Sequence, residues 1–201
     1  MVNYHYIDNM EFMAGCQDKQ YDIAVIDPPY GIDINKSARL VKDKGEKYKD
    51  WDKKIPDPEF FEQLKRVSKH QIIWGGNYFN LGPKRCYLVW DKKQPVDFSF
   101  APVELAWTSY NQNIKMFRWF PQTGNKHRLH PTQKPVALYT WVYKEFAKAG
   151  FKILDTHLGS GSSGIAAYDM GLDFDGCEND KEIFERASKR LKQHINRNHL
   201  F

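Results

Sequence analysis

The chain has 201 residues, of which 41% are hydrophobic and 15% aromatic, so it can form one sizeable core and is not intrinsically disordered. Its net charge of +5 permits a polyanionic partner such as a nucleic acid but does not require one. No apolar run approaches the length of a membrane span, and the first residues carry no signal-peptide pattern, so we expect a single domain without a membrane segment.

The first half of the chain alternates short apolar runs with segments of helical character. A weakly alternating strand is expected over residues 4–8, one or two helical turns over 10–15, and a buried strand over 21–27. Asp57 and Pro58 are typical of a helix N-cap and a first helical position, and the apolar residues that follow share one helical face. Further strands are expected over residues 71–74, 86–91 and 103–108.

The second half of the chain repeats this alternation. Pro135 predicts the first turn of a helix that ends near Gly150, and a strand is expected over residues 151–155. A helix of small residues, a further strand and a closing helix are expected over 163–170, 174–178 and 181–195. Strands that alternate with helices in this way predict a three-layer α/β fold with a largely parallel sheet.

The four residues Asp27-Pro28-Pro29-Tyr30 end the buried strand over 21–27. The two prolines remove two backbone donors and fix φ, so the chain leaves the strand in a rigid, extended turn. The turn holds a carboxylate and an aromatic ring at the carboxyl edge of the strand, where open α/β sheets bind ligands. A plain strand-ending turn is the alternative interpretation of these four residues alone.

A loop rich in glycine and serine lies between a strand and a helix in the second half. Gly159 and Gly161 let the backbone turn tightly and approach a ligand closely. Glu178 ends the next strand, where nucleotide-binding βαβ units place an acid that holds the ribose hydroxyls. Because the loop lacks the full GxGxxG and GxxxxGK[ST] patterns, we expect a nucleoside cofactor without a pyrophosphate.

Three motifs in a fixed order give the chain a resemblance to a known family. The Asp-Pro-Pro-Tyr turn comes first, residues 130–135 then read His-Pro-Thr-Gln-Lys-Pro, and residues 155–161 read Asp-Thr-His-Leu-Gly-Ser-Gly. Over nearly its whole length the chain resembles the β-class amino DNA methyltransferases, and in its compact layout the small methylases of phages and prophages. The resemblance implies a circularly permuted, Rossmann-like methyltransferase fold with a seven-stranded sheet that contains one antiparallel strand.

The resemblance also implies a cofactor, S-adenosylmethionine, and its ligands. Its methionine moiety should lie along the loop that starts at Asp155, its ribose on Glu178 and its adenine near Asp8. The positions that match the family's cofactor site are Asp8, Asp27, Pro131, Thr132, Lys134, Asp155, Leu158, Gly159, Ser160, Gly161, Glu178 and Asn179. Many family members have Pro-Phe where this chain has Thr156-His157, and His157 is either a ligand contact or a solvated loop residue.

The Asp27 turn is suited to the activation of an amine. An exocyclic amine conjugated to a base ring is a poor nucleophile, and hydrogen bonds to Asp27 and to the carbonyl of Pro28 free its lone pair. Pro29 stiffens the turn, and Tyr30 offers a ring on which a base extruded from the duplex can stack. We therefore assign Asp27, Pro28, Pro29 and Tyr30 as the catalytic residues.

The expected reaction is site-specific methylation of adenine N6 in DNA by direct displacement, because an aspartate at the first motif position is associated with adenine in the family. None of Cys16, Cys86 and Cys177 follows a proline, which argues against the thiolate chemistry of 5-methylcytosine formation. Their scattered spacing favours a reducing cytoplasm without a metal site. The alternatives are cytosine N4, RNA, a protein glutamine amide, or a non-catalytic DNA-binding subunit.

Two basic segments with interleaved aromatic residues are the expected contacts with DNA. One is the loop over residues 31–56, and the other is a short target-recognition insertion at about 110–129. The assigned nucleic-acid-binding residues are Lys36, Arg39, Lys47, Tyr48, Lys49, Trp51, Lys115, Arg118, Lys126 and Arg128. A solvated, mixed-charge loop is the alternative for the first segment. A homodimer is compatible with the class, and a restriction endonuclease partner is left open.

Overall fold

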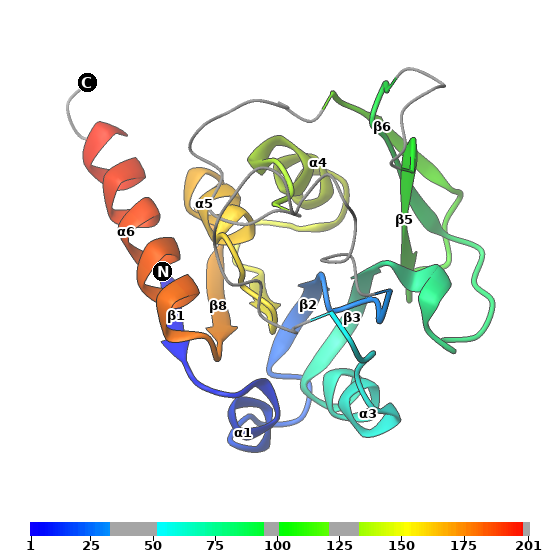
Figure 1. Ribbon diagram of the computed structural model, residues 1–201, viewed down its shortest axis with the longest axis horizontal. Coiled ribbons are helices and arrows are strands. Elements are labelled where there is room, and N and C mark those ends of the chain that lie inside the picture. Colours follow the sequence, from blue (N-terminus) through cyan, green and yellow to red (C-terminus); the bar gives the residue numbers. More distant parts are fainter. Residues whose placement is uncertain (33–51, 95–100, 121–132, 199–201) are drawn as a thin grey trace.

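The computed structural model describes residues 1–32, 52–94, 101–120 and 133–198 (Figure 1). Its elements, in chain order, are β1 (Val2–Tyr6), α1 (Asn9–Ala14), β2 (Tyr21–Ile26), α3 (Pro58–Val67), β3 (Ser68–Trp74), η2 (Gly76–Tyr78), β4 (Tyr87–Asp91), β5 (Val103–Thr108), β6 (Lys115–Arg118), α4 (Val136–Phe146), β7 (Lys152–Asp155), α5 (Ser162–Asp169), β8 (Asp173–Glu178) and α6 (Lys181–Asn198). The predicted alternation of strands and helices is confirmed.

One eight-stranded sheet runs through the molecule in the order β1-β8-β7-β2-β3-β5-β4-β6. Only β5, among the described strands, runs against its neighbours, since β3 and β4 both pair with it in antiparallel register. The expected single antiparallel strand is therefore confirmed, whereas the expected count of seven strands is wrong. The eighth strand is β6, which pairs in parallel with β4 at the edge of the sheet.

The strand β6 was missed because half of its residues are charged. Its sequence is Lys-Met-Phe-Arg, and it falls inside the segment that the sequence assigned to target recognition. An edge strand needs only one neighbour and can leave one face in water, so its apolar signal is weak. Part of the predicted recognition insertion is thus an integral strand of the sheet.

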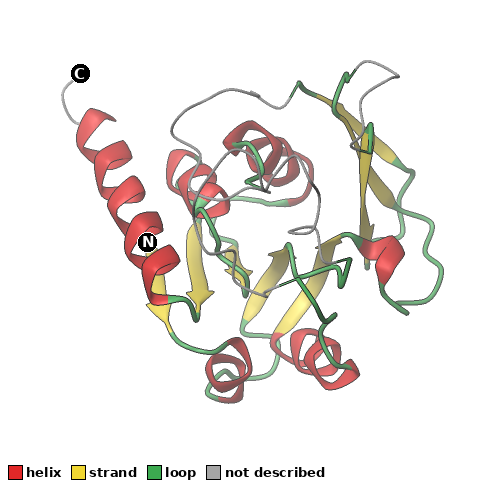
Figure 2. Ribbon diagram, in the orientation of Figure 1, coloured by secondary structure: helices red, strands yellow, loops and turns green. Residues whose placement is uncertain are grey.

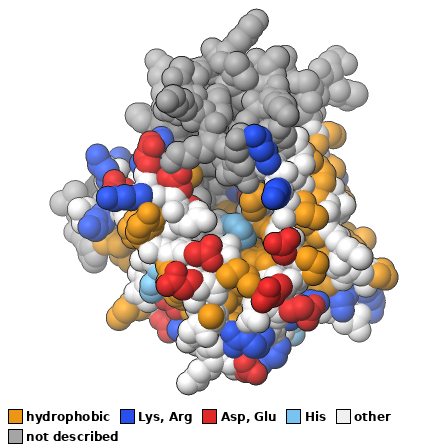
Figure 3. Space-filling model, turned by 60° about the horizontal axis from the view of Figure 1, so that its bottom comes forward, with side chains coloured by type: hydrophobic (Ala, Val, Ile, Leu, Met, Phe, Trp, Pro, Cys, Tyr) orange, Lys and Arg blue, Asp and Glu red, His pale blue; other side chains and the backbone are white. Residues whose placement is uncertain are grey.

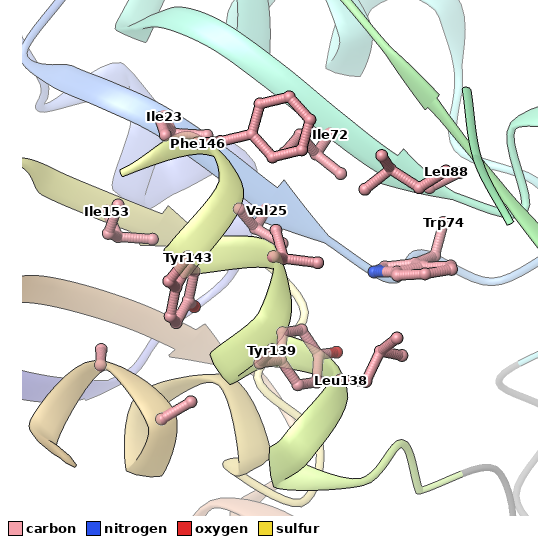
Figure 4. Packing of buried hydrophobic residues seen from close by; sticks show 14 of the residues in the cluster. Ile23, Val25, Ile72, Trp74, Leu88, Leu138, Tyr139, Tyr143, Phe146 and Ile153 are labelled. Atoms are coloured by element: carbon pink, nitrogen blue, oxygen red, sulfur yellow. The ribbon is translucent and has the colours of Figure 1, made fainter. Parts of the chain in front are cut away.

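Helices cover both faces of the sheet, which confirms the three-layer prediction (Figures 1 and 2). On one face α4 and α5 pack on the sheet, and the α4 side chains Leu138, Tyr139 and Tyr143 lie over Val25 and neighbouring strands (Figure 4). On the other face α1 and α3 bury a second apolar cluster. Because β2 is covered on both sides, its side chains are almost continuously buried, as a central parallel strand requires.

Two helix starts differ in detail from expectation. Asp8 is not the end of a strand but the N-cap of α1, where its carboxylate accepts the amides of Met10 and Glu11. Pro135 is the N-cap of α4 rather than its first helical residue. None of the described helices combines the length and the apolar composition that crossing a membrane requires.

The topology brings the carboxyl ends of three neighbouring parallel strands to one edge. β2, β7 and β8 lie next to one another in the sheet and run in the same direction. Asp27 follows β2, Asp155 ends β7 and Glu178 ends β8. The side chains that the sequence singled out separately are therefore presented at a common edge.

Candidate active site

The backbone of the turn after β2 donates hydrogen bonds to the carboxylate of a residue that is distant in the sequence. Asp52 Oδ1 accepts the backbone amides of Tyr30 at 2.7 Å and of Gly31 at 3.0 Å, and Asp52 is 2% exposed. Asp52 is not among the predicted site residues. Its position after the segment 33–51, which the structure does not describe, gave no signal of this role. Asp52 therefore fixes the backbone of the turn at Tyr30 and Gly31.

The Asp27 carboxylate is held at one oxygen by two donors. Lys134 Nζ lies 2.5 Å from Asp27 Oδ1, and the Tyr30 hydroxyl donates to the same oxygen at 2.6 Å. Within the described residues, Asp27 Oδ2 has no hydrogen-bond partner. The side chain retains 20% exposure, so one oxygen is anchored while the carboxylate stays open to a ligand.

Lys134 belongs to a line of alternating charges. Its side chain is only 4% exposed, and its Nζ lies 3.1 Å from Glu104 Oε2 as an ion pair. The other oxygen of Glu104 lies 2.6 Å from Lys92 Nζ. The order Lys92, Glu104, Lys134, Asp27 places each charge beside its opposite, which is how a folded protein tolerates buried ions.

Burial and neighbouring charges act in opposite senses on these groups. Burial is the largest influence on Asp27 and raises its pKa above the ordinary value, while the Lys134 ammonium partly offsets this rise. Burial alone lowers the pKa of Lys134, but Asp27 and Glu104 outweigh it and hold that pKa above its ordinary value. Burial raises the pKa of Glu104, yet its two lysines leave it below the ordinary value. Lys134 is thus a permanent cation beside a carboxyl that burial disfavours as an anion.

The Tyr30 ring is already packed on its neighbours. It stacks on Tyr78 with centroids 5.0 Å apart and an interplanar angle of 13°. A Cβ placed on Gly75 would lie 2.2 Å from Tyr30 Cε1, and Gly75 has a φ of 69°, so only glycine fits against the ring. Tyr78 is 42% exposed. Tyr78 and Gly75 were not among the predicted site residues, although the Gly75-Gly76 break after β3 was visible.

The loop after β7 is shaped by glycines and braced from behind. Gly159 and Gly161 have φ angles of 50° and 73°, and Gly161 is the N-cap of α5. The Tyr4 hydroxyl donates to the carbonyl of Gly161 at 3.0 Å. Arg190, from α6, donates to the carbonyl of Ser160 at 2.8 Å. The predicted tight turn is confirmed, and side chains from β1 and α6 hold it by hydrogen bonds to its carbonyls.

Two of the predicted cofactor residues are carboxylates that face this loop. Asp155 is 1% exposed, accepts the amide of His157 at 3.0 Å and accepts the hydroxyl of Ser163. Glu178 accepts the amides of Gly159 at 3.0 Å and Asp180 at 2.9 Å. Both acids therefore shape the loop backbone in this structure.

The three acids at this edge repel one another. Burial raises the pKa of Asp155 to about 7, and the charges of Asp27 and Glu178 add to this rise. Burial also raises the pKa of Glu178, against the pull of its backbone amides. Acidic side chains that lie close together in a low dielectric favour a cationic ligand.

His157 is not a solvated loop residue. It is half-buried, packs edge-on against Phe60 with centroids 5.3 Å apart, and lies 3.3 Å from the Asn9 amide nitrogen. Burial lowers its pKa to about 4, so the ring is neutral at neutral pH. An aromatic ring therefore stands where the resemblance places a phenylalanine, and its contacts are with the protein.

The remaining predicted cofactor positions divide into described and undescribed ones. Leu158 is 3% exposed and packs into the core beside Gly176, while Asn179 is exposed after β8. Pro131 and Thr132 lie outside the described residues. In the part of the chain that the structure describes, no cluster of acidic, histidine and cysteine side chains has the make-up of a metal site.

Only two of the predicted DNA contacts lie in described segments, and both are on β6. Lys115 Nζ lies 2.7 Å from Glu145 Oε2, and Arg118 Nε lies 3.4 Å from Asp91 Oδ2. Arg118 is two-thirds exposed and keeps most of its surface for a ligand. The other predicted contacts, outside the described residues, are Lys36, Arg39, Lys47, Tyr48, Lys49, Trp51, Lys126 and Arg128.

Comparisons with known proteins agree with this geometry. A family model described as a DNA methylase of the N6/N4 type matches residues 71–189, more than half of the chain. The type II methyltransferase M2.DpnII of Streptococcus pneumoniae is 29% identical over 142 residues, which are 71% of this chain and 49% of that protein. The chain thus spans about half the length of this relative.

Solved structures share the fold at low identity. The M1.HpyAVI–SAM complex has a TM-score of 0.64 at 18% identity and covers 95% of this chain and 99% of its own. The cytosine-N4-specific PvuII DNA methyltransferase has a TM-score of 0.65 at 10% identity, with 97% and 91% covered. These matches show the fold. The family model goes further, and its match, which begins after the Asp27 turn, includes the glycine loop and Glu178. The chain belongs to the N6/N4 DNA methylase family.

Proposed function

We propose that the chain is a DNA methyltransferase that transfers a methyl group from S-adenosylmethionine to the N6 amine of adenine. The observation that carries this proposal is the position of Asp27. Its carboxylate is anchored at Oδ1, and its Oδ2 has no partner among the described residues; Asp27 follows β2, which lies next to β7, the strand before the glycine loop. An amine acceptor and a cofactor loop are thus neighbours at one edge.

The residues at the loop fit this cofactor. S-adenosylmethionine supplies a methyl group on a positively charged sulfonium and also carries an ammonium group. The negative charges of Asp155 and Glu178 suit such a cation. Glu178 would hold the ribose hydroxyls, and the open backbone at Gly159 and Gly161 would border the methionine part. A solved relative in the same fold, M1.HpyAVI, is in complex with this cofactor, which supports the choice.

The chain's own contribution to the reaction is to orient and activate the amine. Asp27 Oδ2 would accept one amine hydrogen, and the carbonyl of Pro28, aimed by the stiff turn, would accept the other. Both bonds draw the nitrogen toward a tetrahedral geometry with a free lone pair. Positioning for an in-line displacement then suffices, and the chain needs no covalent intermediate. The base reaches this site only when it is out of the duplex.

Adenine is preferred over cytosine because the first motif residue is Asp27 rather than serine, a tendency within the family. Methylation of cytosine N4 is the second candidate, and the shared fold with the PvuII enzyme, which is cytosine-N4-specific, favours it specifically. The placement of the Asp27 motif before the glycine loop in the chain supports a circular permutation relative to other methyltransferases.

DNA is the proposed partner, and the basic segments are its proposed contacts. On the face drawn in Figure 3, acidic and basic side chains of the described residues are interspersed with apolar ones. The lysine-rich segment 33–51 and the basic residues Lys126 and Arg128 lie outside the described residues. Salt-sensitive binding through these segments is therefore a proposal that rests on the sequence. A homodimer, a restriction endonuclease partner and a phage origin stay predictions.

A direct test is to express the chain in a host that lacks DNA methylation and to sequence the DNA with long reads that detect modified bases. We expect N6-methyladenine at a defined short sequence. Asp27→Ala is the control and should abolish the mark while the cofactor affinity, measured by calorimetry, stays within a few-fold. Methylcytosine in place of methyladenine would shift the assignment to N4, and a mark that survives Asp27→Ala would remove Asp27 from the reaction.

A further inference from the structure

Lys134 is one of the positions that the resemblance assigns to the cofactor, and in this structure its ammonium pairs with Asp27. Three oxygens lie within 3.1 Å of its Nζ: Asp27 Oδ1 at 2.5 Å, the Tyr30 hydroxyl at 3.1 Å and Glu104 Oε2 at 3.1 Å. An ammonium carries three N–H groups and accepts no hydrogen bond. Lys134 donates a hydrogen bond to the Tyr30 hydroxyl, and its ammonium forms ion pairs with the carboxylates of Asp27 and Glu104.

The surroundings hold Lys134 in this position. The Tyr30 and Trp74 rings each have their centroid 5.6 Å from Nζ, and the side chain is 4% exposed. Cation–ring contacts of this kind strengthen when water is excluded. Glu104 is in turn anchored by Lys92 at 2.6 Å. Lys92 directly follows β4, and Glu104 lies on β5, where it pairs with Trp90 of β4, so the sheet brings the two side chains together.

We propose that Lys134 is a positioning residue for the methyl transfer: it keeps Asp27 ionised and aims its free oxygen at the target amine, while Glu104 and Lys92 hold Lys134 in place. This inference rests on the proposed function for its catalytic part. The pairing itself is a property of the protein without ligands, and it can be tested there.

The charges around Asp27 explain why Lys134 is the residue proposed for this role. The groups that act on Asp27 are Lys134 before α4, Glu104 on β5, Tyr30 in the same turn, Asp155 on β7 and Tyr139 on α4. Of these only Lys134 is a cation, and it opposes both burial and the negative charge of Glu104. A protonated Asp27 retains one acceptor oxygen at most and no longer withdraws charge from the amine, so loss of Lys134 should disable the site at neutral pH.

The experiment compares Lys134→Met, Lys134→Arg and Glu104→Gln. Methionine keeps the length and the apolar contact with Trp74 but removes the charge, and arginine keeps the charge. The Asp27 carboxyl is titrated by carbon-13 NMR in the ligand-free protein and identified by its loss in Asp27→Asn. Methyl transfer from radiolabelled S-adenosylmethionine to DNA is measured from pH 5.5 to 9.5, and cofactor affinity is measured by calorimetry.

For Lys134→Met we expect the Asp27 titration and the acid limb of the rate profile to move up by at least one pH unit. Transfer at pH 7 should fall at least tenfold and recover toward pH 9, with cofactor affinity within threefold. Lys134→Arg should keep the wild-type profile. Glu104→Gln should move the Asp27 titration down, because a neighbouring negative charge is lost, and still slow transfer because Lys134 loses an anchor.

An unshifted Asp27 titration in Lys134→Met overturns the proposal. So does a tenfold loss of cofactor affinity with an unchanged pH profile, because Lys134 would then be a cofactor ligand. If Lys134→Met fails to fold, Glu104→Gln decides alone, and a titration that stays or rises in that variant overturns the proposal. If the wild-type chain methylates no DNA, the proposed function fails, while the carboxyl titration still tests the Lys134–Asp27 pairing.

Discussion

At the scale of single residues, the site depends on carboxyl groups that are hard to ionise. Asp27, Asp155 and Glu178 all have raised pKa values, and burial is the largest cause for each. A folded protein keeps such acids only where something compensates for them. Lys134 compensates Asp27, whereas the compensation for Asp155 comes from one amide and one hydroxyl. A cation bound beside Asp155 would add a positive charge that compensates the ionised carboxylate.

This imbalance predicts a pH-dependent cofactor affinity. The pKa of Asp155 is about 7 without ligand, and a bound cation favours the ionised form. Affinity for S-adenosylmethionine should therefore rise as pH increases toward 7 and level off above it, by roughly tenfold per pH unit at the steepest. Calorimetry between pH 5.5 and 8.5 should also detect proton release on binding.

Asp155→Asn is the matched variant for this prediction, because it keeps the shape and removes the titration. Its affinity should change with pH only as far as the cofactor's own groups titrate. A wild-type affinity that is as flat as that of the variant would contradict a role for Asp155 in binding the cation.

The hydrogen bonds of Glu178 lead to a separate prediction about how the ribose is bound. Its carboxylate accepts two backbone amides and has lone pairs left for two hydroxyls. Glu178→Gln should weaken S-adenosylmethionine binding at least tenfold, because an amide cannot accept from both hydroxyls and the loop. A calorimetric affinity within twofold of wild type would remove Glu178 from that role. Asp180→Asn, on the same loop, is a control expected to bind normally.

At the scale of elements, the turn after β2 depends on a contact across the sequence. Asp52 Oδ1 takes the amides of Tyr30 and Gly31, and Asp52→Ala leaves both without that partner. Each buried amide without an acceptor costs about 1–3 kcal/mol. We expect transfer to slow at least tenfold in Asp52→Ala, with cofactor affinity within threefold. Asp52→Asn keeps an acceptor oxygen and should retain most of the rate, so equal losses in both variants would contradict this account.

The elements also show what the sequence can predict. β2 and α3 were predicted correctly because their burial follows from local periodicity: β2 is apolar throughout, and α3 buries Phe60, Phe61 and Leu64 on one face. The strand β6 was missed because an edge position relaxes that periodicity. Whether a strand lies at the edge depends on the order of the whole sheet, so the four residues of β6 alone do not reveal it.

The residues of the site likewise divide into those that local sequence predicts and those that it does not. Asp27, Gly159 and Gly161 carried their own signals, because prolines and glycines constrain the backbone locally. The roles of Asp52, Glu104 and Lys92 have no such signal, since each depends on a partner brought close by the sheet order. An isolated lysine or glutamate in a sequence is most often solvated, and only the fold distinguishes a buried pair from a surface charge.

At the scale of the whole molecule, one carboxylate joins four strands, and its partners on β2 and β7 are the first residues of those strands. Asp175 on β8 accepts the Asn3 amide of β1 at 3.0 Å and the Tyr21 hydroxyl of β2 at 2.9 Å. His5 Nε2 and Lys152 Nζ each lie 3.0 Å from it. Burial alone raises the pKa of Asp175, but these partners outweigh it and lower that pKa to about 2.

This cluster predicts how the fold responds to acid. The pKa of Asp175 is lower in the folded state than its ordinary value of 3.8, so the stabilisation is present above about pH 4 and is lost as pH falls toward 2. A shift of this size corresponds to about 2 kcal/mol. Asp175→Asn should therefore lower the free energy of unfolding by about 2 kcal/mol at pH 7, and the difference from wild type should shrink between pH 4 and 2.

Denaturant unfolding at pH 7, 4 and 2.5 checks this prediction, with Asp173→Asn as its control. Asp173 is on the same strand and pairs with the chain's amino terminus, but its side chain is 56% exposed, so water screens the pair. The control should unfold like the wild type at every pH. If Asp175→Asn also unfolded like the wild type, the buried charge would contribute nothing to the free energy of unfolding. The four strands would then be held by their backbone hydrogen bonds and apolar faces alone.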